Sequence, residues 1–335
     1  MTDGGFLAEP ATLFLTDADV AQLADWDSAI AALRAAYSRP EDPRATPERA
    51  VAVTATGWQR VMPSAPPGAR FAGSKTIAAS MTNRIASYLI TLFDQHDSRL
   101  AALIDGNRIT GIRTAATAAA ALTALLPARP LTVAVVGSGF EARAQLRAAS
   151  RIARLQAVRV TSPTPANRER FADELGAELG LPISAVADAR TAVEGADLVL
   201  CAARSRDETP TVQSDWVGSD ATIVSVGSTT ASQRELDPAL IGRAAIVVAD
   251  ALEEVLHDSG DMIAARDGGY DPDASTVSLH ALLGGSATRP EHGIAIYKST
   301  GSGFQDIVLA ELLYERAVAQ GLGTPLPVGI LSIPK

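Results

Sequence analysis

The stretch VAVVGSGFEA, residues 133–142, constrains the fold more than any other part of this chain. Four apolar residues lead to Gly137, and Gly139 and Ala142 complete a G-x-G-x-x-A pattern where a helical run begins. Gly137 permits a tight turn, Gly139 allows close backbone approach, and the free N–H groups at the helix start bind anions. Because a strand precedes the pattern and a second strand follows the helix, it predicts a dinucleotide-binding unit. The alternative is a glycine turn that binds no ligand.

Strand-like and helical runs alternate from residue 130 onward, in the order LTVAVVG, EARAQLRAAS, AVRVTS, NRERFADELGAELG, ADLVLCAA, ATIVSVGS and AAIVVAD. This alternation predicts a parallel sheet with helices on both faces. Residues 1–125 mix the two kinds of run: a strand is expected at 87–94 and a helix at 107–126. Helical spacing over 17–38 offers Asp17 and Asp25 as N-caps. A length of 335 residues favours two domains.

Charge and composition exclude several classes of function. A net charge of −9 argues against a nucleic-acid or anionic-membrane surface, although it allows an anionic substrate. Cys201 is the only cysteine, so we expect a buried small apolar residue and no disulfide framework. The four histidines lack metal-ligand spacing, so no metal site is expected. The longest apolar run, 114–126, is too short to cross a bilayer, and no signal peptide is evident. We therefore expect a cytoplasmic protein.

The residues after the second strand bear on the choice of cofactor. An acid there would bind the ribose 2′-hydroxyl of NAD. This chain instead has Thr161, Ser162 and Thr164, followed by Arg168 and Arg170. Hydroxyls and guanidiniums suit a 2′-phosphate, so NADPH is favoured over NADH. The alternative is that the arginines form a solvated helix face.

Three basic residues in apolar surroundings are candidates for binding a carboxylate. Lys75 lies in FAGSKTIAAS, Arg113 begins a small-residue helix in ITGIRTAAT, and Arg49 precedes an apolar run. Guanidinium groups bind carboxylates in bidentate fashion. Each residue taken singly is more often a surface or ion-pair residue, so the prediction depends on the three acting together.

The order of motifs resembles the ornithine cyclodeaminase/mu-crystallin family over essentially the whole chain. The motifs are Met62–Pro63, the SK at Lys75, ITGIRTAAT, GSGFEA, VGS…REL and KSTG…QD. The resemblance implies an α/β fold: a Rossmann doubly wound parallel sheet, plus a split α+β domain for substrate binding and dimerisation. It places the split domain at 1–127 with 306–335 and the NAD(P) domain at 128–305. It also implies a homodimer that acts on a small amino or imino acid.

The resemblance assigns site residues as well. Arg49, Lys75 and Arg113 match positions that grip a substrate α-carboxylate, and Arg60 and Met62 lie on the same substrate segment. The cofactor-binding residues expected from the resemblance and the dinucleotide motif together are Arg113, Thr114, Gly137, Gly139, Phe140, Glu141, Ser162, Thr164, Arg168, Val226, Gly227, Ser299 and Thr300.

Two departures from the family pattern bear on the reaction. Cyclodeaminases of the family have an aspartate where this chain has Thr229, and threonine cannot act as a base near neutral pH. Ornithine-using relatives have an acid where this chain has Arg60, which would repel a distal ammonium. We therefore expect an NAD(P)H-dependent reductase of ketimines or cyclic imino acids, in which Lys75 or a water held by Thr229 supplies the proton.

Three other readings stay open. One is an alanine-type amino-acid dehydrogenase, and another is a cyclodeaminase that uses a different base. The third is a non-catalytic NADPH-binding protein with a crystallin-like role. Opine-type joining of an amino acid to a keto acid is also possible within the family.

Overall fold

The computed structural model describes residues 11–203, 205, 207–327, 329–330 and 333. Its internal contacts divide the chain into two compact units: Met1–Asp25, Asp42–Thr110 and Gly303–Lys335 form the first, and Trp26–Glu41 and Gly111–Ser302 the second. The sequence analysis grouped residues 26–41 and 111–127 with the other domain. Helix α2 (Trp26–Tyr37) joins the second unit because Asp27 pairs with Arg151 and the Tyr37 hydroxyl donates to Asp250 O. The domain boundaries stay a prediction.

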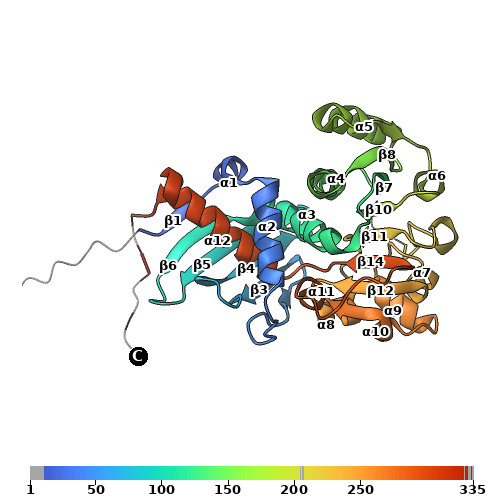
Figure 1. Cartoon of the computed structure of the whole chain (residues 1–335). Coiled ribbons are helices and arrows are strands. Elements are labelled where there is room, and N and C mark those ends of the chain that lie inside the picture. The colour runs from blue at the N-terminus through green and yellow to red at the C-terminus, as the bar shows by residue number, and fades with distance from the viewer. Residues whose placement is uncertain (1–10, 204, 206, 328, 331–332, 334–335) are drawn as a thin grey trace, which may run out of the picture. The chain divides into compact units, whose positions relative to one another are not determined.

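The first unit is a seven-stranded sheet in the order β15-β1-β6-β5-β4-β3-β2. Strands β2 to β6 pair antiparallel in sequence order, whereas β1 runs parallel to β6. Helix α12 (Gly303–Gln320) lies across this sheet, as Figure 1 shows. The other elements are β1 (Leu13–Leu15), α1 (Asp17–Leu23), β2 (Ala50–Val53), β3 (Gly57–Ser64), β4 (Phe71–Ser80), β5 (Ile85–Asp94), β6 (Leu100–Asp105) and β15 (Thr324–Pro325).

Local sequence explains these elements. In β4 the buried residues Phe71, Lys75 and Ile77 share one face, which is the period-two pattern of a strand covered on one side. The predicted strand at 87–94 is β5. The expected N-cap at Asp17 is wrong: Thr16 caps α1, accepting from the Asp19 N–H at 3.2 Å while the Asp19 carboxylate accepts from the Thr16 N–H at 2.8 Å. A capping box satisfies two helix-start donors at once, which a single Asp17 side chain would not do.

The second unit contains an eight-stranded sheet in the order β13-β12-β14-β11-β10-β7-β8-β9, with every neighbouring pair parallel. From β9 to β14 this is the doubly wound order of a dinucleotide fold, and β14, the last strand of this sheet along the chain, is inserted between β11 and β12. Helix α3 (Gly106–Leu125) leads into this unit.

The strands of this sheet are β7 (Leu131–Val136), β8 (Leu155–Thr161), β9 (Ile183–Ala185), β10 (Leu198–Cys201), β11 (Thr222–Ser225), β12 (Ala244–Ala249), β13 (Thr276–Ser278) and β14 (Ile294–Lys298). The helices are α4 (Phe140–Ile152), α5 (Pro165–Leu179), α6 (Ala189–Val193), α7 (Pro238–Gly242), α8 (Leu252–Asp258), α9 (Gly260–Asp267), α10 (Pro272–Ser275) and α11 (Leu279–Leu283), with a 3-10 turn at Ser214–Trp216.

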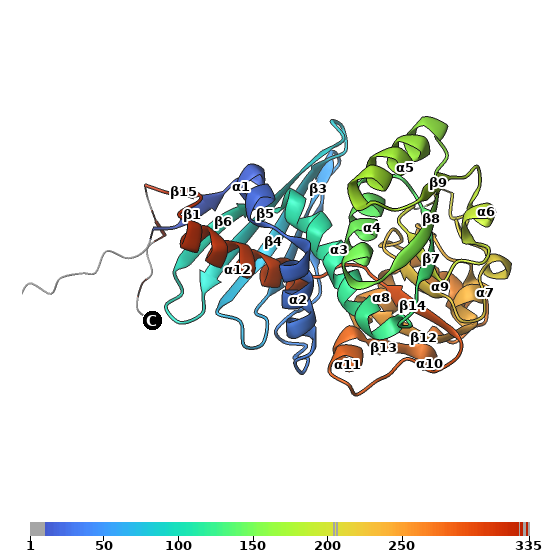
Figure 2. The ribbon, with the colours of Figure 1, turned by 45° about the horizontal axis from the view of Figure 1, so that its top comes forward.

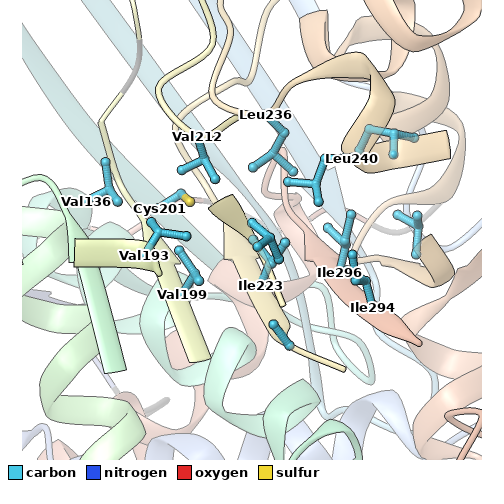
Figure 3. Packing of buried hydrophobic residues seen from close by; sticks show 14 of the residues in the cluster. Val136, Val193, Val199, Cys201, Val212, Ile223, Leu236, Leu240, Ile294 and Ile296 are labelled. Atoms are coloured by element: carbon cyan, nitrogen blue, oxygen red, sulfur yellow. The ribbon is translucent and has the colours of Figure 1, made fainter. Parts of the chain in front are cut away.

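Both faces of this sheet are buried, as predicted. Consecutive residues Val133 to Val136 are all buried, and adjacent residues of a strand point to opposite faces. One face forms a core cluster with helices α6 to α9, which includes Val199, Ile223 and Ile296 (Figure 3). Cys201 lies in this cluster, fully buried, as expected for a small apolar residue. Helices α4 and α5 lie beside β7 and β8 (Figure 2). Among the described residues, no helix combines the length and apolarity needed to cross a bilayer.

Candidate active site

The glycine pattern forms the expected turn between β7 and α4. Gly137 has φ +113°, and a Cβ there would lie 2.7 Å from the carbonyl oxygen of Ala202. Gly139 is the N-cap of α4, has no side chain to satisfy the helix-start donors, and a Cβ there would meet nothing within 4 Å. Ala142, at the third position, is fully buried. The backbone N–H groups at the start of this 13-residue helix are therefore open to an anion such as a pyrophosphate.

Phe140 and Glu141 open α4 and differ in their surroundings. The Phe140 side chain is 58% exposed, and its ring lies against Gly111, where a Cβ would stand 2.2 Å from the ring. A side chain at 111 would therefore displace the ring from this position. Glu141 lies in the first helix turn, where a carboxylate faces the positive end of the helix dipole.

The segment after β8 brings Arg168, and not Arg170, to the predicted ribose-reading position. Arg168 donates to Ser162 O at 2.9 Å, whereas Arg170 donates to Asn167 along α5. The Ser162 hydroxyl accepts from the Ser138 hydroxyl of the glycine turn at 2.9 Å, and Thr164 is the N-cap of α5. A guanidinium and two hydroxyl side chains therefore lie on the segment that follows β8.

Asp250 organises the loop that contains Ser299 and Thr300. Its carboxylate accepts from the Ser299 hydroxyl at 2.6 Å and from the Thr300 and Gly301 N–H groups at 3.0 Å each. The Thr300 hydroxyl oxygen is buried and lacks a hydrogen-bond partner among the described residues, so this loop can bond to a ligand amide. The sequence reasoning missed Asp250. The sequence could have indicated it, because Asp250 is an acid at the carboxyl end of the buried strand AAIVVAD. Folds of this kind bind their ligands at the carboxyl ends of the strands.

Arg113 of α3 lies against the loop that contains Ser299 and Thr300, and Thr114 follows it on the same helix. Both are buried, and the Arg113 guanidinium lies against Gly301, where a Cβ would stand 2.5 Å from Nη1. Gly301 has φ +76°, so this loop needs glycine for its backbone conformation as well as for space.

The loop after β11 holds Thr229 in hydrogen bonds to Gln233. The Thr229 N–H and hydroxyl both donate to Gln233 Oε1, at 2.9 and 3.3 Å, and the Ser228 hydroxyl donates to Gln233 O at 2.9 Å. Thr229 thus bonds to the Gln233 amide oxygen, which is not a base as a carboxylate would be. The nearby acid Glu235 is fully buried and accepts from the Gly227 N–H at 2.8 Å.

Glu235 belongs to a buried charged cluster that the sequence reasoning missed, although the motifs REL and KSTG contain two of its members. We call Ser225, Glu235, Asp261 and Lys298 the Glu235 cluster. Burial raises the pKa of Glu235, an effect that the ammonium of Lys298 opposes. Burial, followed by the charges of Glu235 and Asp261, raises the pKa of the Cys201 thiol well above its ordinary value, so that thiol is not a ready nucleophile.

In the first unit, Lys75 forms a buried ion pair. Its Nζ lies 2.7 Å from Oδ2 of Asp306, in the first turn of α12, and both side chains are at most 1% exposed. Gly303 allows α12 to come this close, because a Cβ there would lie 2.5 Å from Met62 O. The sequence reasoning missed Asp306, although the QD motif contains it. A Lys75 ammonium already paired with a carboxylate is less available as a simple carboxylate receptor than the sequence suggested.

Strand register brings three of the predicted substrate residues onto one face. Met62 stands directly opposite Lys75, and Arg60 opposite Ile77, so Arg60, Met62 and Lys75 share the face covered by α12. Met62 is buried, whereas Arg60 is half-buried with its guanidinium 5.2 Å from the Trp58 ring. Arg49 directly precedes β2, and continuing the β2–β3 register by one residue places it opposite Met62. The binding roles of these residues stay predictions.

The fold and the glycine turn define a dinucleotide-dependent oxidoreductase. Residues 11–321 match the model of the ornithine cyclodeaminase/mu-crystallin family, and the chain belongs to that family. It is 30% identical over 240 residues to the iminosuccinate reductase of Paracoccus denitrificans (strain Pd 1222), covering 71% of this chain and 73% of that one. It is 30% identical over 230 residues to the ketimine reductase mu-crystallin of Mus musculus, covering 68% of each chain.

Among solved structures, the chain is similar to the Thermococcus litoralis Delta(1)-pyrroline-2-carboxylate reductase in complex with NADH and L-proline. The TM-score is 0.87 at 26% identity, over 94% of this chain and 100% of that one. The predicted family, fold class, enzyme class and nicotinamide cofactor are confirmed. The choice between NADPH and NADH stays a prediction. Within the described residues, no group of three or more His, Cys, Asp or Glu side chains is arranged to hold a metal ion.

Proposed function

We propose that this protein reduces an imino acid, a ketimine or a cyclic imino acid such as pyrroline-2-carboxylate, to the L-amino acid with NAD(P)H. The observation that carries the proposal is Thr229, a hydroxyl held by Gln233, at the position where cyclising relatives keep a proton-accepting carboxylate. A hydride adds to the C=N carbon, and a proton adds to the nitrogen, which yields an amine without loss of ammonia. The similarities to an iminosuccinate reductase, a ketimine reductase and a pyrroline-2-carboxylate reductase support the same reaction type.

The residues present fit a nicotinamide dinucleotide. The start of α4 offers open N–H groups for the pyrophosphate, Ser162 and Arg168 face the ribose-reading position, and the Thr300 hydroxyl has bonding capacity for the amide. The reduced nicotinamide, when bound, supplies the hydride. Val226 and Gly227 after β11, and Ser299 and Thr300 after β14, would flank its ring. Because Arg168 donates to Ser162 and no acid is present there, NADPH is the proposed form.

Lys75 and its partner Asp306 would control the proton. An imine accepts hydride well only when its nitrogen is protonated, and a buried ammonium can donate that proton. The carboxylate of Asp306 would balance the positive charge of Lys75, because a buried charge without a partner costs free energy. Arg49, in the same unit as Lys75, would hold the substrate carboxylate and fix the reacting carbon, so that positioning supplies much of the rate enhancement.

The position of Arg60 favours a substrate that has a second carboxylate. Its guanidinium lies on the Lys75 face, half-buried over Trp58, and it would repel the distal ammonium of ornithine. The chain is also similar to an iminosuccinate reductase. A dicarboxylic imine such as iminosuccinate should therefore be tested as a substrate beside cyclic imino acids.

A screen of imino acids with both cofactors tests the proposal. Purified protein is mixed with pyrroline-2-carboxylate, piperideine-2-carboxylate, or oxaloacetate with ammonia, and with NADPH or NADH, and loss of absorbance at the reduced-nicotinamide band is followed. We expect reduction of at least one imine, faster than NADP⁺-linked oxidation of alanine. Conversion of ornithine to proline with release of ammonia and no net change in cofactor would refute it. Tight NADPH binding without turnover of any imine would favour the non-catalytic reading.

We also propose a homodimer, formed through apolar side chains exposed on the first unit. Val53, Met81 and Ile85 are 76%, 65% and 64% exposed, and they lie at neighbouring strand ends, since the Met81 N–H donates to Thr56 O between β2 and β3. Exposed apolar clusters of this kind mark interaction surfaces. A cytoplasmic location stays a prediction.

A further inference from the structure

Three charged side chains are fully buried at the carboxyl edge of the second unit's sheet. Glu235, Asp261 and Lys298 are each 0% exposed. Burying charges costs free energy that an apolar core would not need, so such a cluster is weak evidence for stability alone. Its place, at the strand ends where doubly wound sheets bind ligands, is informative.

Glu235 ties together the ends of two neighbouring strands. Its Oε2 accepts from the Ser225 hydroxyl at 2.7 Å and from the Gly227 N–H at 2.8 Å, both at the end of β11. Its Oε1 accepts from the N–H of Ala203, just after β10, at 2.9 Å. These two oxygens therefore receive three hydrogen bonds from fixed donors, an arrangement that suits an ionised carboxylate.

Asp261 and Lys298 hold Glu235 in place. Asp261 Oδ1 accepts from the Glu235 and Leu236 N–H groups at 2.8 and 3.2 Å, which fixes the backbone of the segment. Lys298 Nζ lies 2.9 Å from Asp261 Oδ2 and donates to the Ser225 hydroxyl at 2.8 Å. Ser225 thus links the ammonium to Glu235, and the cluster spans β11, β14 and the start of α9.

We propose that Glu235 is the positioning residue for the loop Val226–Thr229, and through it for the nicotinamide end of the cofactor. The inference rests on the proposed function, which places Val226 and Gly227 beside the nicotinamide. Gln233, two residues before Glu235, holds the rest of the loop, because it accepts hydrogen bonds from Ser228 and Thr229. The turn at Gly137, which would hold the pyrophosphate, has its own anchor in the N–H bond to Thr161 O at 2.9 Å.

Comparing a whole dinucleotide with its fragment tests this. Dissociation constants are measured for NADPH and for 2′-phospho-ADP-ribose, which lacks nicotinamide, or for NADH and ADP-ribose if the wild type binds those more tightly. In Glu235→Gln an NH₂ group replaces an acceptor oxygen and faces a donor. We expect the dinucleotide to bind at least about tenfold more weakly and the fragment less than about threefold more weakly. Fluorescence of the bound reduced nicotinamide should fall as well.

Two further variants complete the test. Ser225→Ala breaks the link between Lys298 and Glu235 without a change of charge, so it should also weaken the dinucleotide more than the fragment, but by a smaller factor. This variant replaces Glu235→Gln if Glu235→Gln does not fold. Asp197→Asn is the matched control: Asp197 accepts from the Thr132 N–H at 2.8 Å at the amino end of the same sheet, and its change should leave the dinucleotide-to-fragment ratio unaltered.

The outcomes separate the two proposals. Equal weakening of dinucleotide and fragment, or weakening of neither, overturns the positioning role while leaving a cofactor-binding enzyme. A wild-type protein that binds neither dinucleotide overturns the proposed function and this inference with it.

Discussion

At the residue scale, the features that distinguish this chain are an alcohol and a buried ion pair. By the family resemblance, Thr229 stands at the position of the base in cyclodeaminases, and its hydroxyl donates to Gln233 Oε1. Lys75 is paired with Asp306 in surroundings from which water is almost excluded. In the proposed function, the first feature removes a proton acceptor, and the second would hold a proton donor with its compensating charge. Together they favour adding a proton to an imine over removing one from an amine.

Replacing Lys75 tests the donor. Lys75→Met should lower kcat for the reduced imine by roughly a hundredfold to ten-thousandfold, the range for loss of a general acid. It also leaves Asp306 buried without its partner, which costs about 3–5 kcal/mol of stability. Lys75→Met/Asp306→Asn has no charge at either position and should recover much of the lost stability but none of the rate, as measured by thermal unfolding and initial velocities. A double variant that regains activity along with stability would show that Lys75 is structural only.

At the element scale, the turn between β7 and α4 separates two uses of glycine. Gly137 is required by the fold, because its φ is positive and a side chain would meet the Ala202 carbonyl. Gly139 has an ordinary φ of −79° and open space, so the fold tolerates a side chain there. In the proposed cofactor site, the ligand requires the open space, since the pyrophosphate would have to reach the N–H groups of α4.

Two alanine substitutions distinguish these uses. Gly137→Ala should destabilise the protein by about 1–3 kcal/mol, the range for a strained backbone, and more if the contact with Ala202 is not relieved. Gly139→Ala should keep the wild-type Tm yet bind the dinucleotide at least about tenfold more weakly. Thermal unfolding and a binding titration on each variant measure both effects. Wild-type affinity in Gly139→Ala would mean that the pyrophosphate does not approach this backbone.

At the scale of the whole molecule, the sheet of the first unit ends in an exposed edge strand, β2. All four residues of β2 are exposed, and β2 pairs only with β3. An edge strand with exposed valines is a liability unless another chain covers it. The homodimer proposed above would cover both the edge and the apolar strand ends.

A charge at these strand ends tests the dimer. Ile85→Asp combined with Val53→Asp should convert a particle of twice the 34.7 kDa chain mass into a monomer, because each carboxylate would be buried unpaired in the interface. Light scattering after size-exclusion chromatography measures the mass. Val318→Asp is the control, since Val318 is 55% exposed on α12 and lies outside the apolar strand ends. A wild-type chain that is already monomeric would contradict the proposal.

The sequence by itself determined the elements and the cofactor turn, because their signals are local. Apolar runs such as 131–136 form strands wherever helices can cover them, and a glycine turn before a helix creates its anion site from a few consecutive residues. Only the tertiary structure decided which charges meet. Asp306 reaches Lys75, and Lys298 reaches Ser225 and Asp261, across long stretches of chain. It also decided that Arg168, and not Arg170, faces Ser162. Partners of this kind depend on strand order and helix placement, and no local pattern of residues records them.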